Sequence, residues 1–256
     1  MAELLVLPAL LAYGEAAVAY VRELRGPGLA GRLAIWGVRL GWLAQTALLA
    51  GQALAADGFP WRTWAGSLNL FVWLVVGAYL IWGCTPRYRL LGLAVMPLAA
   101  VLLALAWAGG GTGFGPVDRS GAVLALHVGL MLAGFAGLTL AAGMSALYLW
   151  QERRLKRHER RLLRVRFPPL DALDRLGVRA VAVSLVLLVL GIGVGASRFE
   201  RGDFDAAMAA TGVVIAFYAT LLVLRHEGWR GRRAALLGSG GFALVAVVLA
   251  LTHFAG

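Results

Sequence analysis

The chain has 256 residues, of which 61% are hydrophobic and only 14% are charged. A soluble domain carries about 25% charged residues, so this composition excludes an ordinary soluble enzyme or binding domain. The formal net charge of +11 would suit a nucleic-acid-binding protein, but the charge lies in short segments between long apolar runs. The composition therefore predicts an integral membrane protein. Its expected partner is membrane lipid, and no nucleic-acid partner is expected.

Eight apolar runs follow one another along the chain, and most have the roughly 20 residues that a helix needs to cross a membrane. The expected transmembrane helices are Leu4–Val21, Leu33–Ala56, Trp64–Cys84, Leu90–Ala108, Gly121–Trp150, Val178–Ser197, Ala206–Leu224 and Ala234–Phe254. Apolar residues lie on all sides of these segments rather than on one stripe. No linker is long enough for a second domain. We therefore predict an all-α, polytopic helical bundle that forms a single transmembrane domain over residues 1–256.

Basic residues predict how this bundle is oriented. Of the 24 lysines and arginines, 19 fall in alternate connections between the expected spans or at the span ends next to them. By the positive-inside rule these connections face the cytoplasm, and both termini face outward. The most basic connection, 151–175, is expected to extend the fifth span, break at Pro168 and Pro169, and restart a helix capped by Asp171. This segment is either a docking site for a cytoplasmic partner or a topology anchor that contacts anionic lipid.

Cysteine usage and the first residues exclude several functions. The single cysteine, Cys84, rules out a CxxC motif for thiol exchange and a CxxCH motif for covalent haem attachment. The protein is therefore neither a disulfide oxidoreductase nor a c-type cytochrome. The first residues, Met1–Glu3, lack the basic region of a cleaved signal peptide, so we expect the first span to be retained.

Two charged residues lie inside expected spans, where an ionisable side chain is a candidate functional residue. Glu15 and Arg39 are each about six residues from the predicted cytoplasmic edge, or about 9 Å deep at the rise of an α-helix. One interpretation is a proton or anion relay, as in a transporter of small solutes. The other is a structural ion pair or a snorkelling arginine.

Two histidines are the candidate ligands of a metal or cofactor. The topology places His127 and His253 at similar depth near the outer face, in the fifth and eighth spans. Histidine is a common ligand of haem iron and of transition metals. The alternative for each is a hydrogen-bonded structural histidine. Met131, one turn after His127, is either another axial ligand or a packing residue. His158 and His226, in predicted cytoplasmic segments, are expected to be solvated.

The remaining polar and aromatic residues suggest no catalytic machinery. Asp203 and Asp205 are close in sequence but lack a surrounding ligand cluster, and no nucleophilic triad or phosphate-binding glycine loop is present. We therefore predict no catalytic residue. Tryptophans near the ends of the expected spans are predicted to be interfacial anchors; they are Trp61, Trp64, Trp107, Trp150 and Trp229.

Four segments resemble a known family, in the order in which that family has them. They are FPWRTWAGSLNLFVW (Phe59–Trp73), ALHVGLMLAGFAGLTLAAGMSALYLWQERRLK (Ala125–Lys156), FPPLDALDRL (Phe167–Leu176) and GWRGRRAA (Gly228–Ala235). On these segments the chain resembles the cytochrome c assembly membrane proteins of the CcsA/CcmC type, most closely their compact HemX-like and YpjD-like members. The resemblance covers most of the chain.

This resemblance implies a haem cofactor, b-type and held without covalent attachment. His127 lies in the LH motif that opens the fifth span of the family, and His253 takes the place of a later outer histidine. Both are therefore implied to be axial ligands of the haem iron. An outer arginine would pair with a haem propionate; the candidates are Arg62, Arg119, Arg198 and Arg201.

The chain departs from the family between the sixth and seventh spans. A tryptophan-rich loop is expected there, but Ser197–Met208 reads SRFERGDFDAAM and contains no tryptophan. We therefore do not expect the enzymatic attachment of haem to apocytochrome.

The leading expectation is a bacterial inner-membrane protein that binds or handles haem during cytochrome c maturation, alongside other cytochrome assembly or respiratory-chain proteins. One alternative is a non-catalytic membrane regulator or assembly partner, as HemX-like control of haem synthesis implies. Another is the small-solute transporter.

Overall fold

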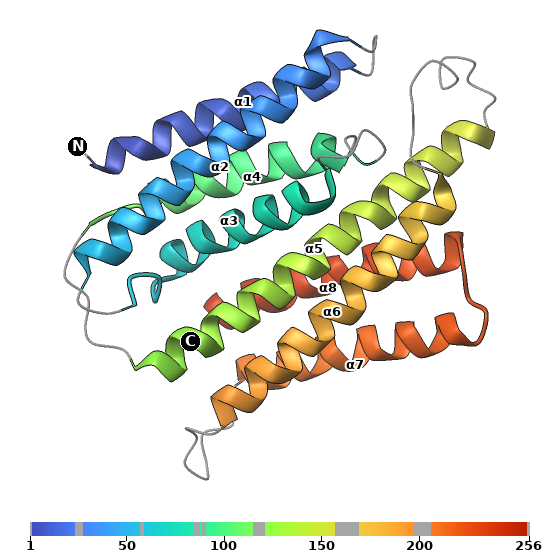
Figure 1. Cartoon of the computed structure of the whole chain (residues 1–256). Coiled ribbons are helices and arrows are strands. Elements are labelled where there is room, and N and C mark those ends of the chain that lie inside the picture. Colours follow the sequence, from blue (N-terminus) through green and yellow to red (C-terminus); the bar gives the residue numbers. More distant parts are fainter. Residues whose placement is uncertain are drawn as a thin grey trace. The chain divides into compact units, whose positions relative to one another are not determined.

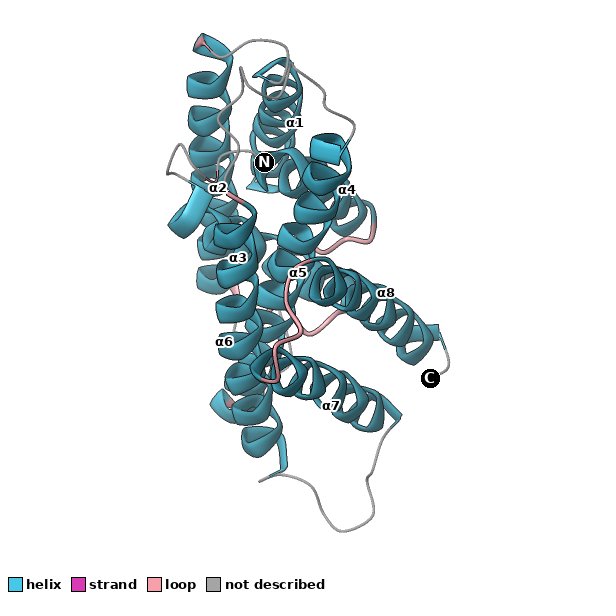
Figure 2. Cartoon of the chain, turned by 90° about the vertical axis from the view of Figure 1, so that its right-hand side faces the viewer, coloured by secondary structure: helices cyan, strands magenta, loops and turns pink. Residues whose placement is uncertain are grey.

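The computed structural model describes residues 2–23, 28–56, 59–83, 88, 91–114, 121–156, 169–196 and 206–254. Side chains at 2–3, 82–83, 206–207 and 244–254 lie outside this description. In the described part every regular element is helical (Figure 2). The elements are η1 (Ala2–Leu5), α1 (Val6–Glu23), α2 (Leu29–Ala55), α3 (Trp64–Gly83), α4 (Gly92–Ala108), α5 (Ala122–Lys156), α6 (Leu170–Ala196), α7 (Ala206–His226) and α8 (Arg232–Phe254).

The helices follow the eight predicted spans, and two of them extend beyond the apolar runs. α5 continues to Lys156, where the Nζ of Lys156 lies 2.8 Å from Glu152 Oε1 across one turn. α6 begins at Leu170, well before its apolar run. Asp171 lies within its first turn rather than at a cap, and pairs with Arg175 at 2.7 Å. A carboxylate there is favoured by the positive end of the helix dipole. The predicted break falls among residues 157–168, which lie outside the described residues.

Contacts among the helices divide the chain into two compact units. Unit 1 comprises Met1–Ala125 with Glu159–Phe167, and unit 2 comprises Leu126–His158 with Pro168–Gly256. Each unit is described by itself. The expectation of a single transmembrane domain stays a prediction.

Unit 1 is built from α1 to α4 (Figure 1). α1 packs against α2 and α4, and α3 packs against α4 and α2. Large side chains that are fully buried fill its interior, among them Tyr13, Tyr20, Leu48, Met96 and Leu103. The hydroxyl groups of Tyr20 and Tyr79 lie 2.7 Å apart and join α1 to α3. Two buried phenols thus satisfy each other in an apolar interior, where an unbonded hydroxyl would be costly.

Unit 2 is built from α5 to α8, and its helices run antiparallel to their neighbours. At one end of the α5–α6 pair, Gly195 lies against His127; near the other end, Gly177 lies against Met144. α6 also contacts α7, and α7 contacts α8 (Figure 2). The hydroxyl of Tyr218 on α7 donates to the carbonyl oxygen of Gly238 on α8 at 3.5 Å. In unit 2 the last turn of each helix therefore lies at the same end of the unit as the first turn of the helix that follows it.

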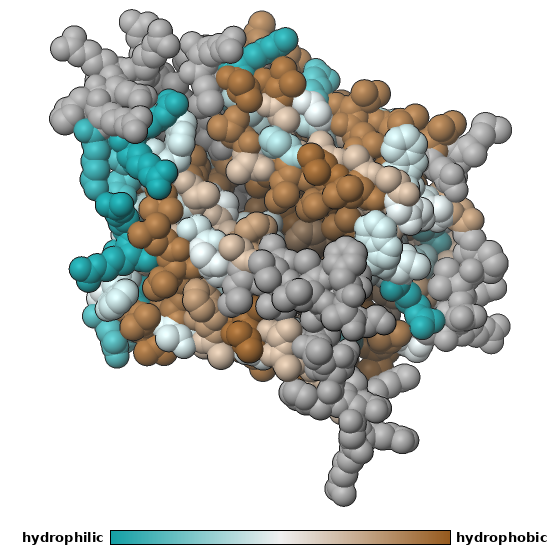
Figure 3. Space-filling model, turned by 180° about the vertical axis from the view of Figure 1, so that it is seen from behind, coloured by the Kyte–Doolittle hydropathy of each residue, from teal (hydrophilic) through white to brown (hydrophobic). Residues whose placement is uncertain are grey.

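Large apolar side chains cover the outside of the helices. On α2, Leu29, Leu33, Trp36, Leu40 and Leu43 are each more than half exposed and are spaced three or four residues apart. Figure 3 shows a broad hydrophobic surface on the face that it draws. Among the described residues, α2, α3, α5, α6 and α7 are long and apolar enough to cross a membrane. The bundle is therefore polytopic, while the count of eight spans and the outward termini stay predictions.

Candidate functional site

His127 lies in the second turn of α5 and faces α6. Its Nδ1 is 2.7 Å from the carbonyl oxygen of Gly191. The imidazole is half-buried rather than fully enclosed. The interface between two antiparallel helices therefore holds this ring by a direct bond to the backbone.

The hydrogen bond determines which ring nitrogen carries the proton. A carbonyl oxygen only accepts, so Nδ1 of His127 must be the donor. In the neutral imidazole the other nitrogen, Nε2, then carries a lone pair. Among the residues that the structure describes, Nε2 has no hydrogen-bond partner. The arrangement matches that of metal-binding histidines, which almost always donate their other N–H to a carboxylate, backbone carbonyl or water.

Two glycines of α6 let the imidazole approach the helix backbone. A Cβ added at Gly195 would lie 2.7 Å from Nδ1 of His127 and 2.8 Å from its Cε1. At Gly191 the added Cβ would lie 2.8 Å from Sδ of Met131. These two glycines form a GxxxG pattern, which allows helices to pack closely in a membrane. The sulfur of Met131 is thus in the α5–α6 interface, where the packing interpretation of this residue applies.

His253 lies in the last turn of α8, and its side chain is outside the described residues. The backbone nevertheless places it along the helix. α8 is antiparallel to α5, because Gly238 lies against Ser145 and Gly231 against Tyr148. Counting fifteen residues in opposite directions from the Ser145–Gly238 contact reaches His253 on α8 and Leu130 on α5. The two candidate ligands thus belong to the same end of unit 2, and a shared ligand stays a prediction.

The other histidines and the charged pair of unit 1 have different surroundings. His226 is exposed at the end of α7 opposite to His127, as expected for a solvated residue. Glu15 and Arg39 are both exposed, and the Arg39 guanidinium carbon lies 5.3 Å from the centre of the Trp36 ring. Because both side chains are exposed, the structure does not support a proton or anion relay that is enclosed by the bundle.

Of the remaining predicted polar residues, one lies in the described part of the chain and the others lie outside it. Arg62 is exposed in the segment that precedes α3. The residues that lie outside the described part of the chain are Cys84, Arg119, His158, Arg198, Arg201, Asp203 and Asp205. The loop that lacks the family's tryptophans, 197–205, lies outside it as well.

Sequence reasoning missed a network of buried amides in unit 1. The hydroxyl of Tyr13 donates to Oε1 of Gln45 at 2.8 Å, and Nε2 of Gln45 donates to Oδ1 of Asn69 at 2.9 Å. Nδ2 of Asn69 in turn donates to Oε1 of Gln52 at 3.3 Å. All four side chains are at most 3% exposed. Amides inside apolar spans were the available signal, and Asn69 lies within a segment that carried the family resemblance.

The same network holds the segment after α4. Nε2 of Gln52 donates to the carbonyl oxygens of Gly111 at 3.1 Å and Gly113 at 2.9 Å. Nε1 of Trp61 donates to Oε1 of Gln52 at 3.2 Å, so this tryptophan has a structural bond besides its expected anchoring role. A Cβ at Gly111 would lie 2.2 Å from the backbone of Ala65, so only glycine fits there. These bonds connect α2, the start of α3 and the segment after α4.

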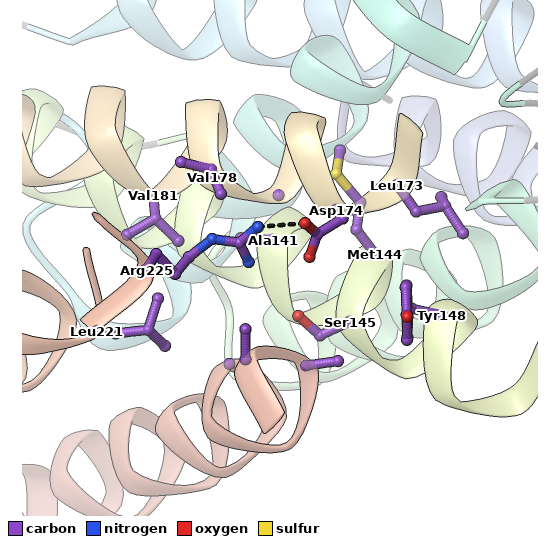
Figure 4. Close-up of a pocket in the computed structure, with 14 residues that line it drawn as sticks. Ala141, Met144, Ser145, Tyr148, Leu173, Asp174, Val178, Val181, Leu221 and Arg225 are labelled. Carbon is purple, nitrogen blue, oxygen red and sulfur yellow. Dashed lines mark hydrogen bonds and ion pairs between the residues drawn. The ribbon is translucent and has the colours of Figure 1, made fainter. Parts of the chain in front are cut away.

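The opposite end of unit 2 contains a small pocket with an ion pair at its side (Figure 4). All four helices of the unit line it, and its apolar wall includes Met144, Val181 and Leu221. The guanidinium of Arg225 on α7 pairs with the carboxylate of Asp174 on α6, and both side chains are only about 14% exposed. The hydroxyl groups of Ser145 and Tyr148 belong to the same lining. The pair connects two helices, and sequence reasoning did not identify it.

The donor set favours haem over a bare metal ion. In the described residues, no group of three or more His, Cys, Asp or Glu side chains could hold an ion. Haem needs only axial ligands from the protein, since the porphyrin supplies the other four. A single half-buried imidazole with an available Nε2 fits that requirement.

Comparison with known proteins agrees with the resemblance of the four segments. A family model described as "Cytochrome C assembly protein" matches residues 61–254. The inner membrane protein YpjD of Escherichia coli (strain K12) is 29% identical over 136 residues, which are 50% of this chain and 49% of YpjD. The matched part thus spans about half the length of that relative.

Two other relatives match different shares of the chain. Protein HemX of Brevibacillus brevis is 27% identical over 225 residues, 84% of this chain and 80% of HemX. The cytochrome c biogenesis protein CcsA of Prochlorococcus marinus (strain MIT 9312) is 34% identical over 98 residues, 36% of this chain and 32% of CcsA. No solved structure matches the chain.

These findings confirm the predicted localisation. The apolar helices and the relatives together identify a multi-pass protein of the bacterial inner membrane. Since the family model covers well over half of its residues, the chain belongs to the cytochrome c assembly protein family.

Proposed function

We propose that this protein binds haem at the end of unit 2 that contains His127, and that it handles this haem in support of cytochrome c maturation. Nε2 of His127 would be an axial ligand of the iron, and His253 the second ligand. Because the only cysteine is Cys84 and no CxxCH motif exists, the haem would be held without covalent bonds. We propose the b-type haem that the family resemblance implies. Bound haem would supply the iron centre, and neutral imidazole nitrogens of His127 and His253 would hold it.

The hydrogen bond from Nδ1 of His127 to Gly191 is the observation that carries this proposal. It keeps the proton on Nδ1, leaves the lone pair of Nε2 available and restrains rotation of the ring. The backbone carbonyl cannot move away without distorting α6, because helix hydrogen bonds hold it. The glycine at 195 completes the arrangement, since a larger residue would displace the imidazole.

Other residues of unit 2 have supporting roles in this proposal. The residues next to His127 on α5 and α6 are apolar, so a haem held there would lie among apolar side chains. His253 belongs to the same end of the unit by the antiparallel arrangement of α5 and α8. No attachment of haem to an apocytochrome is proposed, because Ser197–Met208 lacks tryptophan.

A second candidate is a non-catalytic membrane partner or regulator. The HemX match favours it, because that relative aligns with 84% of this chain whereas CcsA aligns with 36%. A colourless purified protein that retains a soluble enzyme through residues 151–175 would favour this candidate over haem handling.

A haem titration of the purified full chain in detergent, followed by the Soret band, tests the proposal. The wild-type protein is expected to give a ligated spectrum, and His127→Ala to lose more than about a hundredfold in haem affinity. His253→Ala is expected to change the spectrum by removing the second ligand. His226→Ala is the matched control, since that histidine is exposed at the other end of unit 2. Equal haem binding by wild type and His127→Ala would contradict the proposal.

A further inference from the structure

One end of unit 2 is strongly basic. This basic end is formed where α5 and α7 finish and where α6 and α8 begin. Its described residues include nine basic side chains against four acidic ones. The basic residues are Arg153, Arg154, Lys156, Arg175, Arg179, Arg225, Arg230, Arg232 and Arg233, and the acidic ones are Glu152, Asp171, Asp174 and Glu227. Hydrophilic side chains gather along the left edge in Figure 3, beside the hydrophobic surface.

The turn after α7 and the first two residues of α8, which together we name the basic turn (residues 227–233), hold three exposed arginines close to an exposed tryptophan. Trp229 is 40% exposed, and the guanidinium carbon of Arg233 lies 5.6 Å from the centre of its ring. Arg230 and Arg232 are also exposed. Nε of Arg232 is 3.9 Å from Glu152, a carboxylate that Lys156 also contacts.

The exposed carboxylate of Glu227 is the acidic residue within the turn. With one acid against three arginines, the turn keeps a positive charge. Charge complementarity therefore favours an anion.

This combination suits the phosphate of a lipid. A guanidinium stacked on an indole keeps its N–H edge available for a phosphate, which it binds through two parallel hydrogen bonds. Tryptophan prefers the level of the lipid headgroups. A second such pair, Arg154 over Trp150 at 4.3 Å, occurs at the end of α5. α7 is long and apolar enough to cross a membrane, which would place the turn that follows it at the membrane surface.

We propose that the basic turn binds the phosphate of anionic phospholipid headgroups. The role is separate from haem binding, which is proposed for the opposite end of unit 2. A lipid bound there would stabilise the junction of α7 and α8.

Native mass spectrometry of the full chain, released from nanodiscs of phosphatidylcholine with added phosphatidylglycerol, tests this proposal. The variant R230Q/R232Q/R233Q removes three charges from the turn, and R153Q/R175Q/R179Q removes three exposed charges elsewhere at the same end. Each headgroup-contacting arginine contributes about fivefold, so the turn variant should lose on the order of a hundredfold in phosphatidylglycerol affinity. The control variant should stay within severalfold of wild type. Unchanged binding by the turn variant, or an equal loss in the control, would overturn the proposal.

Two further measurements complete the test. Inorganic phosphate in tenfold excess should leave phosphatidylglycerol bound, and its displacement by phosphate would show a simple anion site instead of a lipid site. If the turn variant does not fold, the single substitutions Arg230→Gln and Arg233→Gln replace it. Each should weaken binding about fivefold, and wild-type affinity in both would refute the proposal.

Discussion

Units 1 and 2 both contain polar side chains among apolar helices, but they satisfy them differently. In unit 1 the buried amides of Gln45, Gln52 and Asn69 bond to one another and to backbone carbonyls. In unit 2 the imidazole of His127 uses one nitrogen for the backbone and leaves the other available among the described residues. A network whose groups satisfy one another stabilises the fold, whereas a partly used imidazole can bind a ligand.

The comparison also concerns charge. The amide network of unit 1 is neutral, so it can be buried at small cost once its hydrogen bonds are made. Unit 2 instead has the Asp174–Arg225 ion pair near its basic end. Charged groups need closer compensation in an apolar surrounding, which explains why this pair is nearly buried and joined across two helices. We therefore expect substitutions in the two units to change the free energy of unfolding by different amounts.

The largest effect on stability is expected from Gln52→Leu in unit 1. This substitution leaves the carbonyl of Gly113 and the indole N–H of Trp61 without the groups that they contact. It leaves the Gly111 carbonyl and Nδ2 of Asn69 with only their mutual bond at 3.4 Å. The free energy of unfolding, measured by titration with SDS in mixed micelles, should fall by about 3 kcal/mol. Thr220→Val is the matched control, since that hydroxyl bonds only within its own helix and is exposed. Equal losses in both variants would contradict a structural role for the network.

A smaller effect is expected at the ion pair of unit 2. Asp174→Asn removes the charge that Arg225 contacts and should lower the free energy of unfolding by about 2 kcal/mol. Asp171→Asn removes the same charge three residues earlier on α6, but there both partners are about two-thirds exposed. This control should cost less than about 0.5 kcal/mol. The double change Asp174→Leu with Arg225→Met should recover most of the loss. If the double variant is no more stable than Asp174→Asn, the loss in Asp174→Asn does not come from leaving the charge of Arg225 without its partner.

The smallest effect is expected on haem affinity, from alanine substitution of one of two nearby glycines of α6. A Cβ at Gly195 would lie within 2.8 Å of the His127 ring, whereas nothing lies within 4 Å of a Cβ at Gly193. Gly195→Ala should displace the imidazole and weaken haem binding about tenfold, as for the loss of a group that orients a ligand. Gly193→Ala should bind haem like wild type. Similar affinity in both variants would show that Gly195 does not position the ring.

Much of the fold follows from hydropathy. Every predicted span corresponds to a helix. A long apolar run is visible in a single sequence and needs no knowledge of tertiary contacts. The basic segment was expected to extend the fifth span and to restart a helix before the sixth apolar run, and α5 and α6 do extend beyond their apolar parts. The ion pair Glu152–Lys156, which accompanies the extension of α5, was not predicted. The division into two units depends on which helices touch, and hydropathy contains no such information.

The candidate site was predictable only in part. Position within the spans and the family resemblance identified His127, but the bond to Gly191 joins residues 64 positions apart. The amides of Gln45, Gln52 and Asn69 are visible in sequence only as polar residues inside apolar spans, and each becomes informative when its partners are known. The same holds for Asp174 and Arg225, which are 51 positions apart.

Imidazole rescue of His127→Gly tests the central claim most directly. The variant leaves a space where the ring stood, so added imidazole should replace it as an axial ligand. We predict that haem added to the variant gives a spectrum unlike that of wild type, and that imidazole restores the wild-type Soret band. A variant whose spectrum already equals that of wild type, before imidazole is added, would contradict ligation by His127.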